Sequence, residues 1–280
     1  MKQFLLNTEP DKDGLVRFEG KDYNYLVRVR RLASGEFFPA VLPNGEEKLI
    51  KIISVNNRTL TGKCESSLNL NPLSSSSAIS RTAGSTPPRL CENSSRIILF
   101  QALPKGDKMD TIVRQAAESG IAEIVPFVSE YSVAKTKAEG QKFSRWERII
   151  KEARQQSGSK VSTAIHHPLK MGELFNYWQK LKNDESFQPA LGLLFHHQML
   201  QKGLEQNSLH RYLDISPKIV VLTIGPEGGF SDSEVSLFLE NGFKPITIGD
   251  TILRTETAAL YCTAAVRIIL LEREAWELKK

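Results

Sequence analysis

A glycine-rich segment and a threonine-containing segment near the C-terminus have residue types that suit a ligand-binding loop. The first, Gly225-Pro226-Glu227-Gly228-Gly229, follows an apolar run and precedes a helical pattern, and so does the second, Leu253-Arg254-Thr255-Glu256-Thr257-Ala258. Glycines let the backbone approach a ligand closely and adopt positive φ, whereas proline stiffens a turn. Such loops can recognise a small molecule through backbone groups, and Arg254 and Glu256 add charge and proton chemistry.

Structural explanations remain open for several of these residues. The first segment has neither the GxGxxG spacing of a dinucleotide site nor the Lys-Ser/Thr of a P-loop, so a phosphate cradle is not favoured and a purely structural turn stays possible. Thr255 or Thr257 can cap the following helix, and Glu256 suits its positive end. Arg254, a charged residue in an apolar loop, is explained by solvation, by an ion pair or by function.

Both segments belong to a part of the chain in which strands and helices alternate. Apolar runs predict strands over residues 96–101, 123–127, 190–195, 218–224 and 245–248, and helices that begin near Asp107, Ser144, Ser231 and Thr255. Ser144 and Ser231 are each followed three residues later by a glutamate, which is the capping-box pattern. This predicts an α/β domain with a mostly parallel sheet, and such sheets bind ligands at the carboxyl ends of their strands.

The first 65 residues have a different pattern. Short strands are predicted over residues 15–18, 36–42, 49–55 and 59–64, with turn residues between them. One helix, residues 23–32, carries Arg28, Arg30 and Arg31. We expect a small β-barrel with one basic helix, whose arginines either contact RNA or lie on a solvated face.

Residues 66–95 are rich in serine and proline and poor in large apolar side chains, which predicts a flexible linker or insertion between domains at 1–65 and 96–280. The three cysteines are widely spaced without a CxxC pair, which favours buried thiols in a reducing compartment. Neither a signal-peptide core nor a run of 18 uncharged apolar residues is present, so the expected location is the cytoplasm, away from membranes.

The charge of the chain is small but unevenly distributed. The 280 residues include 37 basic and 32 acidic side chains, and 40% hydrophobic residues exclude wholesale disorder. Residues 96–170 carry 13 basic and 8 acidic side chains, whereas residues 171–280 carry 11 and 14. Unless it arises by chance, this distribution suits a protein that holds a polyanion on one side and a cationic or zwitterionic small molecule on the other.

The two C-terminal segments, taken in order, resemble a known family. Residues 225–229 followed by residues 253–258 are similar to the RsmE family of ribosomal RNA methyltransferases. Further motifs occur in family order: Lys105-Gly106-Asp107-Lys108-Met109, Glu118-Ser119-Gly120-Ile121 with Ile124-Val125-Pro126, and Arg145-Trp146 through Gln156-Ser157-Gly158. The resemblance covers most of the chain except the serine-rich segment.

The resemblance implies a PUA-like RNA-binding β-barrel followed by a SPOUT-type α/β domain with a C-terminal trefoil knot, a feature that folding rules alone would not predict. It also implies a homodimer whose pocket is completed near the partner subunit, and S-adenosylmethionine as the cofactor. The cofactor contacts carried over from the family are Leu194, Phe195, His196, Gly225, Gly229, Ile248, Leu253 and Thr257.

The implied activity is methylation of N3 of a specific uridine in 16S ribosomal RNA, within the small ribosomal subunit. Arg254 is predicted to stabilise the charge that develops on uracil as N3 loses its proton, and Glu256 is the weaker candidate for the base. N3 lies in the pairing edge, so the target must be unpaired or flipped. A SPOUT enzyme acting on another RNA base or a ribose, and an inactive RNA-binding module, stay open.

The predicted RNA contacts are Lys2, Gln3, Arg28, Arg30, Arg31, Lys105, Lys108, Arg114 and Lys160. Gln3 and Ser159 stand where the family usually has arginine, so Lys2 and Lys160 would supply charge without the planar guanidinium fork. For Arg114 the alternative is a surface ion pair with Glu118 on one helix. The adjacent histidines at 166–167 and 196–197 lack metal-ligand spacing, and no metal is predicted.

Overall fold

The computed structural model describes residues 4–6, 8–43, 46–65, 95–132, 139–196, 207–247 and 249–277. The chain divides into two compact units, one made of residues 1–87 with 155–162 and the other of residues 88–154 with 163–280. The serine-rich segment, residues 66–94, lies outside the described residues, so its assignment as a linker stays a prediction.

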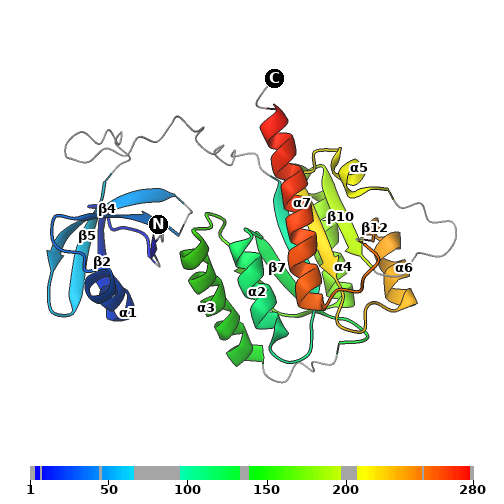
Figure 1. Cartoon of the computed structure of the whole chain (residues 1–280), viewed down its shortest axis with the longest axis horizontal. Coiled ribbons are helices and arrows are strands. Elements are labelled where there is room, and N and C mark those ends of the chain that lie inside the picture. The colour runs from blue at the N-terminus through cyan, green and yellow to red at the C-terminus, as the bar shows by residue number, and fades with distance from the viewer. Residues whose placement is uncertain are drawn as a thin grey trace. The chain divides into compact units, whose positions relative to one another are not determined.

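The first unit is built on a five-stranded sheet in the order β1-β3-β4-β5-β2 (Figure 1). Its strands are β1 (Phe4–Leu5), β2 (Leu15–Glu19), β3 (Phe37–Val41), β4 (Glu47–Val55) and β5 (Thr59–Glu65). Strand β1 pairs in parallel with β3, and the other pairs are antiparallel. The four strands predicted from the sequence are confirmed, and the two-residue β1 was not predicted.

Alternation along the strands creates the core of this unit. Phe18, Phe38, Ile50 and Leu60 are each at most 3% exposed and pack in one cluster. A Cβ on Gly62 would stand 2.4 Å from the Ile50 side chain, so the sheet tolerates only glycine there without a shift. The sheet therefore buries one face, as the period of two in its sequence predicts.

The predicted helix over residues 23–32 is confirmed as a helix, but its bounds and its geometry differ from the prediction. Helix α1 (Gly20–Tyr23) continues into a π-helix, Asn24–Val29. A π-turn is wider than an α-turn, so a period of 3.6 residues does not describe which of its positions are buried. The chain leaves the helix at Arg30, and Arg31 has a positive φ of 54°.

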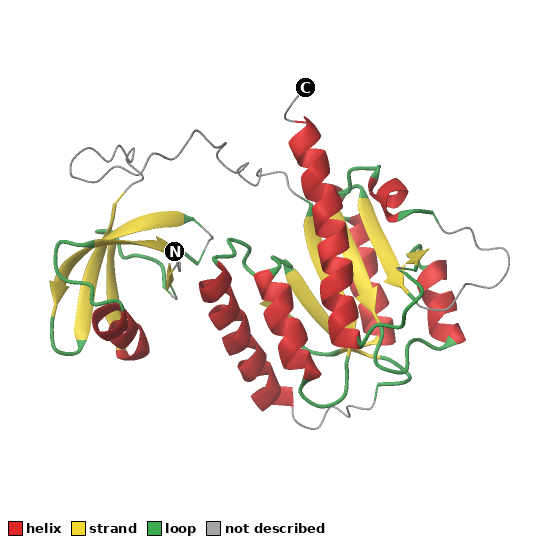
Figure 2. Cartoon of the chain, viewed as in Figure 1, coloured by secondary structure: helices red, strands yellow, loops and turns green. Residues whose placement is uncertain are grey.

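The second unit contains a sheet whose strands are yellow in Figure 2. The sheet has seven strands in the order β12-β10-β11-β6-β7-β8, with β9 also paired to β7. Its strands are β6 (Arg96–Ala102), β7 (Glu123–Val128), β8 (Ala164–Ile165), β9 (Leu169–Lys170), β10 (Ala190–Phe195), β11 (Ile219–Ile224) and β12 (Lys244–Ile246). Every pairing among these strands is parallel. The predicted α/β domain with a parallel sheet is confirmed.

Helices cover both faces of this sheet, which explains why β11 is buried at all six positions. They are α2 (Lys108–Glu118), α3 (Glu139–Ser157), α4 (Met171–Asn183), the 3-10 turn η2 (Glu185–Phe187), α5 (Leu209–Leu213), α6 (Asp232–Glu240) and α7 (Thr255–Glu277). Residues of α2, α3, α5 and α7 join one core cluster, and residues of α4 and α6 join another. Among the described residues, no helix is long and apolar enough to span a membrane.

One of the two predicted capping boxes is confirmed. Ser231 Oγ accepts from the backbone N of Glu234 at 3.3 Å, and Glu234 Oε2 accepts from the backbone N of Ser231 at 3.0 Å. The box at Ser144 is wrong because α3 begins at Glu139 and places Ser144 inside the helix. Phe143 packs against the same core cluster as Trp146, so the apolar stripe of α3 begins before the capping pattern.

A buried ion network lies at the amino ends of β6 and β7. Glu123 is 7% exposed, and its carboxylate accepts from Arg96 Nη2 at 2.5 Å, from His166 Nε2 at 2.6 Å and from the Tyr177 hydroxyl. Burial alone would raise the pKa of Glu123, but the hydrogen bonds from His166 and Tyr177 and the charge of Arg96 lower it to about 2. Glu123 is therefore an anion that ties β7 to β6 and α4.

The C-terminal part of the sheet has an unusual strand order. The chain runs from β10 to the adjacent β11, then through α6 to β12 on the other side of β10. It returns through residues 247–254 to α7, which contacts β11 and α2. This path brings the segments that follow β11 and β12 to the same edge of the sheet.

Candidate cofactor-binding site

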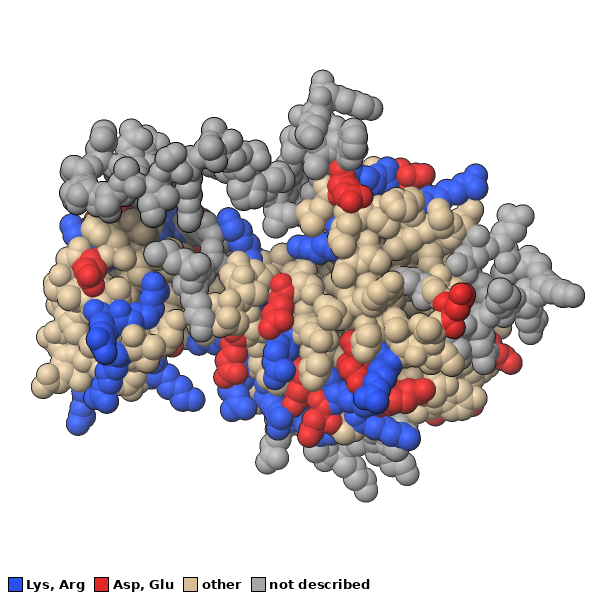
Figure 3. All heavy atoms as spheres, viewed as in Figure 1, with Lys and Arg blue, Asp and Glu red and all other residues tan. Residues whose placement is uncertain are grey.

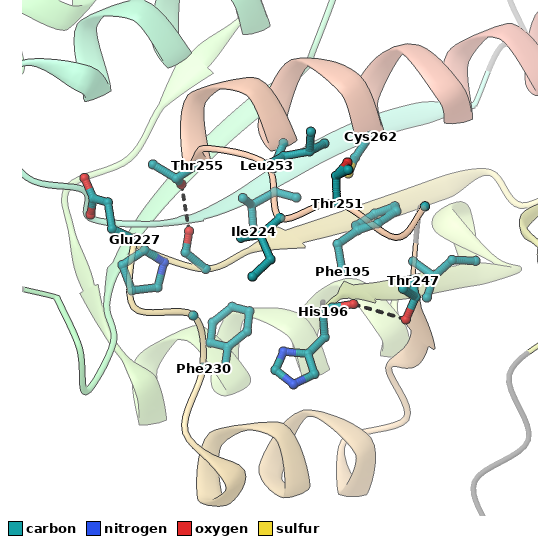
Figure 4. A pocket seen from close by; sticks show the side chains of 17 residues that line it. Phe195, His196, Ile224, Glu227, Phe230, Thr247, Thr251, Leu253, Thr255 and Cys262 are labelled. Carbon is teal, nitrogen blue, oxygen red and sulfur yellow. Dashed lines mark hydrogen bonds between the residues drawn. The ribbon is translucent and has the colours of Figure 1, made fainter. Parts of the chain in front are cut away.

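A cavity opens at the carboxyl ends of β10, β11 and β12 (Figure 4). Phe195, Ile224 and Ile246, which are the last residues of these strands, stand in register across the sheet and line the cavity. Together with its open mouth the cavity encloses about 710 Å³. Ligands of parallel sheets bind at this edge, where the strands end.

The first glycine loop forms one wall of the cavity. The backbone N of Gly229 donates to Pro226 O at 3.0 Å, and Gly229 has a φ of 73° that favours glycine. A Cβ on Gly225 would come within 3.3 Å of the Phe230 ring and 3.4 Å of Gly229. The turn is therefore too narrow for a side chain at Gly225 unless its neighbours move.

Thr255 connects the second loop to the first. Its hydroxyl donates to Gly225 O at 2.7 Å (Figure 4). The same hydroxyl accepts from Gln101 Nε2 at 3.1 Å. Gln101 Nε2 also donates to Ala102 O at 2.9 Å, and since a carbonyl only accepts, this contact identifies the nitrogen of the amide. The relay fixes the direction of the Gly225 carbonyl and so the peptide plane in the cavity wall.

A charged cluster connects the first loop to α2. The Glu227 carboxylate accepts from Lys108 Nζ at 2.7 Å and from the backbone N of Lys105 at 3.1 Å. Although partial burial opposes it, the hydrogen bond from Lys108, with those from backbone amides, lowers the pKa of Glu227. Lys108 Nζ also lies 4.0 Å from Glu256 Oε2, a buried atom without a hydrogen-bond partner among the described residues. Lys108, predicted to contact RNA, is thus already engaged by Glu227.

Most of the predicted cofactor contacts reach the cavity. Phe195, His196, Gly225, Gly229 and Leu253 line it. The side chain of Leu194 is instead buried in the core cluster of α4 and α6, and Thr257 is exposed on α7 outside the cavity lining. Ile248 lies outside the described residues. Their roles as cofactor contacts stay predictions.

Arg254 is placed directly beside the cavity. It stands between Leu253 and Thr255, which both line the wall, and its backbone O accepts from the N of Ala258 at 2.8 Å in the first turn of α7. Its side chain is exposed and forms no hydrogen bond or ion pair with any described residue. The structural alternative of a paired arginine is therefore not supported within the described chain.

The predicted RNA-binding residues of the first unit differ in exposure. Arg28 and Arg31 are exposed, and Lys and Arg side chains gather over α1 (Figure 3). Arg30 is half-buried with its guanidinium 6.0 Å from the centre of the Phe38 ring, and its Nη1 has no hydrogen-bond partner in the described chain. Lys2 and Gln3 lie outside the described residues.

The predicted RNA-binding residues Lys105, Arg114 and Lys160 are all exposed. The alternative ion pair between Arg114 and Glu118 does not form within the described residues. Each of the three side chains is thus accessible from solvent, and their contacts with RNA stay predictions.

The histidines at 166, 167 and 196 have structural partners, and His197 lies outside the described residues. His166 bonds to Glu123, and the His167 ring stacks on Phe143 with ring centres 4.0 Å apart. The backbone N of His196 donates to Ile246 O at 3.1 Å, and His196 O accepts from Thr247 Oγ1 at 3.2 Å. No group of three metal-ligating side chains occurs among the described residues.

Sequence reasoning missed several residues of the site. Phe230 and Cys262 line the cavity, and the Gln101 amide donates a hydrogen bond to the Thr255 hydroxyl. Gln101 left a signal in the sequence, since it is a polar residue at the end of the otherwise apolar run of β6. A buried amide in a strand needs a partner, and this one binds the residue that begins α7.

Comparison with known proteins places the chain in a family. The sequence model of an RNA methyltransferase domain matches residues 91–267. Ribosomal RNA small subunit methyltransferase E of Aquifex aeolicus is 30% identical over 234 residues, 83% of this chain and 86% of that protein. The Synechocystis protein of the same name is 32% identical over 174 residues, 62% of this chain but only 54% of that protein.

A solved structure shares the fold. The crystal structure of a ribosomal RNA small subunit methyltransferase E from Neisseria gonorrhoeae, bound to S-adenosyl methionine, covers 96% of this chain and 98% of its own, with a TM-score of 0.68 and 20% identity. The family match includes both loops of the cavity and the segment that holds Lys105 and Lys108. The chain belongs to the ribosomal RNA small subunit methyltransferase E (RsmE) family of RNA methyltransferases.

Proposed function

We propose that this protein transfers the methyl group of S-adenosylmethionine to N3 of a uridine in 16S ribosomal RNA. Membership of the family supports a cofactor-dependent methyltransferase activity on ribosomal RNA. The observation that carries the finer proposal is the exposed Arg254, which forms no ion pair with a described residue and stands between two residues of the cavity wall. The choice of uridine N3 comes from the family resemblance, and the nucleotide map described below separates it from an activity on another base or a ribose.

The cavity suits the cofactor chemically. Phe195, Ile224 and Leu253 supply apolar surface, and the two loops supply backbone donors and acceptors for the polar edge of adenine. Gly225 and Gly229 line the cavity without side chains, which leaves their backbone groups accessible to a ligand. When bound, S-adenosylmethionine supplies an electrophilic methyl group on a sulfonium. We assign Phe195, His196, Gly225, Gly229 and Leu253 to its binding, and Leu194, Ile248 and Thr257 by family resemblance.

Arg254 acts on the substrate in this mechanism. The nitrogen must lose its imide proton before it can attack, and the positive guanidinium stabilises the negative charge that develops on the ring. Each unit by which Arg254 lowers the pKa of N3 is worth about 1.4 kcal/mol. Glu256 Oε2 has no hydrogen-bond partner among the described residues and is the weaker candidate for the base.

The RNA is held by basic residues of both units in this proposal. Arg28, Arg30, Arg31 and Lys160 of the first unit, with Lys2 and Gln3, would contact its backbone. Lys105 and Arg114 of the second unit would contact phosphates near the target. We assign the first unit as a PUA-like barrel. Its enclosed aromatic core favours closure of the five-stranded sheet into a barrel. The substrate is 16S ribosomal RNA within the small ribosomal subunit, in the cytoplasm.

We assign the second unit as a SPOUT-type domain with a C-terminal trefoil knot. Its support is the crossing from β11 to β12 on the far side of β10, followed by the return of the chain to pack α7 on β11. A knot needs such a crossing and return, because one segment must pass through the loop that another makes.

We propose that the protein is a homodimer that pairs through α7. Leu260, Tyr261, Ile268 and Leu271 are 38%, 52%, 54% and 40% exposed, and at 3.6 residues per turn they fall on one side of the helix. An exposed apolar face of this kind marks an association surface. A partner helix there would lie close to the loop of residues 249–254.

The proposed reaction is tested by mapping modified nucleotides. Ribosomal RNA from a strain that lacks the gene should miss one N3-methylated uridine in 16S RNA, and the purified protein with S-adenosylmethionine should restore it. Loss of a different modification, such as a ribose methyl group, would refute the uridine assignment, and an unchanged map would refute the activity.

We expect Thr255→Val to weaken cofactor binding about 10-fold. Valine keeps the shape and branching of threonine but removes the donor to Gly225 O and one of the two acceptors of the Gln101 amide, a loss of about 1–3 kcal/mol. Isothermal calorimetry with S-adenosylmethionine measures the change. Thr255→Ser, which keeps the hydroxyl, is the matched control and should bind nearly as well as the wild type. Equal affinities for the valine and wild-type proteins would show that the relay does not shape the site.

A further inference from the structure

A tyrosine in the turn after β7 lies against the first cavity loop. Tyr131 is 48% exposed, although tyrosine is usually more deeply buried. A Cβ on Gly228 would come 3.0 Å from Tyr131 Cβ and 3.5 Å from its Cδ2, so the side chain packs on this glycine. Gly228 stands between Glu227 and Gly229, which both line the cavity. An exposed aromatic side chain therefore rests on the loop that forms the cavity wall.

The turn that carries Tyr131 is anchored to α6. Ser129 Oγ donates to Glu234 Oε2 at 3.1 Å, and the backbone N of Glu130 donates to Glu234 Oε1 at 2.8 Å. The backbone N of Ser132 donates to Ser129 O at 2.9 Å and closes the turn. Glu234 is 5% exposed, so these bonds are shielded from water. The backbone at Tyr131 is thus fixed before any ligand binds, which lowers the entropic cost of binding.

Two cations stand on the other segments that hold the same loop. The backbone N of Lys105 donates to Glu227, and Arg254 precedes Thr255, which donates to Gly225 O. Neither cationic side chain pairs with an acidic residue in the described part of the chain, and both are exposed. Exposed aromatic rings combined with free cations are how proteins hold single-stranded nucleic acid: bases stack on the rings and phosphates meet the cations.

We propose that Tyr131 is a substrate-binding residue on which a nucleobase of the RNA strand stacks, next to the site of methyl transfer. The inference rests on the proposed function, because a uridine methylated at N3 must be unpaired and so leaves neighbouring bases free to stack. Lys105 holds the phosphate backbone of the same strand. Stacking on one aromatic residue changes affinity for a single strand by about 5- to 100-fold.

The test compares Tyr131→Ala, Tyr131→Leu and Tyr131→Phe in the full chain. Unmethylated small ribosomal subunits serve as substrate, and transfer of a radiolabelled methyl group gives KM for the RNA. Alanine and leucine should raise this KM by about 5- to 100-fold, and phenylalanine should keep it within about 2-fold of the wild type. The Kd for S-adenosylmethionine should be the same in all three variants. Leu237→Ala removes another exposed apolar side chain, 41% exposed on α6, and should leave KM unchanged.

An abasic substitution identifies the stacked base. In a 16S RNA fragment that contains the target, an abasic residue is placed at each position beside the target in turn. One position should weaken binding to the wild type about as much as Tyr131→Ala does, and should weaken binding to Tyr131→Ala no further.

Several results would overturn the inference. Leucine restoring the wild-type KM would mean that Tyr131 only packs on Gly228, and an unchanged KM for alanine would mean that it contacts no RNA. A parallel loss of cofactor affinity would assign Tyr131 to the cofactor loop instead. Failure of the proposed function looks different, since the wild type itself would then transfer no methyl group, and fragment binding would still report on stacking.

Discussion

Replacement of Arg254 by alanine should lower kcat by about 10²- to 10³-fold, the loss seen when one group that stabilises a developing anion is removed. KM for the RNA should change far less, because one exposed cation contributes little to binding a large polyanion. The Kd for S-adenosylmethionine should stay the same, since the Arg254 side chain does not line the cavity. Single-turnover methylation of small ribosomal subunits separates kcat from binding.

Two variants control this experiment. Arg254→Lys keeps the charge without the planar fork and should recover only part of the rate. Arg148→Ala removes an arginine on α3 whose contact is a surface pair with Glu152 at 3.9 Å, and it should retain full activity. A wild-type kcat for Arg254→Ala would exclude Arg254 from the chemistry, and a lost cofactor affinity would move its role to the cavity.

The fold of the second unit was predictable wherever hydrophobic runs alternate with helix start signals. Its long strands β6, β7, β10 and β11 are apolar because helices cover both faces, and this pattern is visible without a structure. The start of α6 was predictable from the reciprocal pair of Ser231 and Glu234. The start of α3 was not, because its first residues extend the helix before any cap residue occurs.

Other features could not be read from local patterns. The π-helix at Asn24–Val29 depends on packing against the sheet, which shifts the buried positions away from a period of 3.6. The two-residue strands β1, β8 and β9 are too short to show alternation. The position of β12 beyond β10 is a long-range property of the sheet, and no residue of β12 signals it.

For the candidate site, the sequence identified the loops of the cavity better than the side-chain contacts between distant residues. Glycines at 225 and 229 were recognisable because a narrow turn and a positive φ restrict the residue type. The engagement of Lys108 by Glu227 was not, because the two residues are 119 positions apart in the chain. A lysine near a predicted RNA site is naturally assigned to phosphate, and only the fold shows that a carboxylate already holds it.

The Glu123 network illustrates the same limit, since its four members come from β6, β7, α4 and the segment after β8. The pKa of Glu123 lies near 2 in the folded state against an ordinary value of 4.5. A carboxyl with a lowered pKa stabilises the fold above its unfolded pKa, and this contribution is lost as the pH falls from about 4.5 through about 2. The shift corresponds to about 3 kcal/mol of unfolding free energy.

We therefore expect the free energy of unfolding to fall by about 3 kcal/mol more in the wild type than in Glu123→Gln when the pH is lowered from about 5 to about 2. At neutral pH, Glu123→Gln should destabilise the second unit by about 1–3 kcal/mol, because the groups of His166, Tyr177 and Arg96 lose their charged acceptor. Denaturation followed by the fluorescence of the buried Trp146 and Trp178 measures both effects in this unit. If Glu123→Gln prevents folding, Tyr177→Phe is the alternative, because it removes only one hydrogen bond to the carboxylate. Its free energy of unfolding at neutral pH should be lower than that of the wild type, by less than is expected for Glu123→Gln. Glu240→Gln, an exposed carboxylate on α6, should follow the wild-type pH profile. Equal pH profiles for the wild type and Glu123→Gln would mean that the network does not stabilise the folded state.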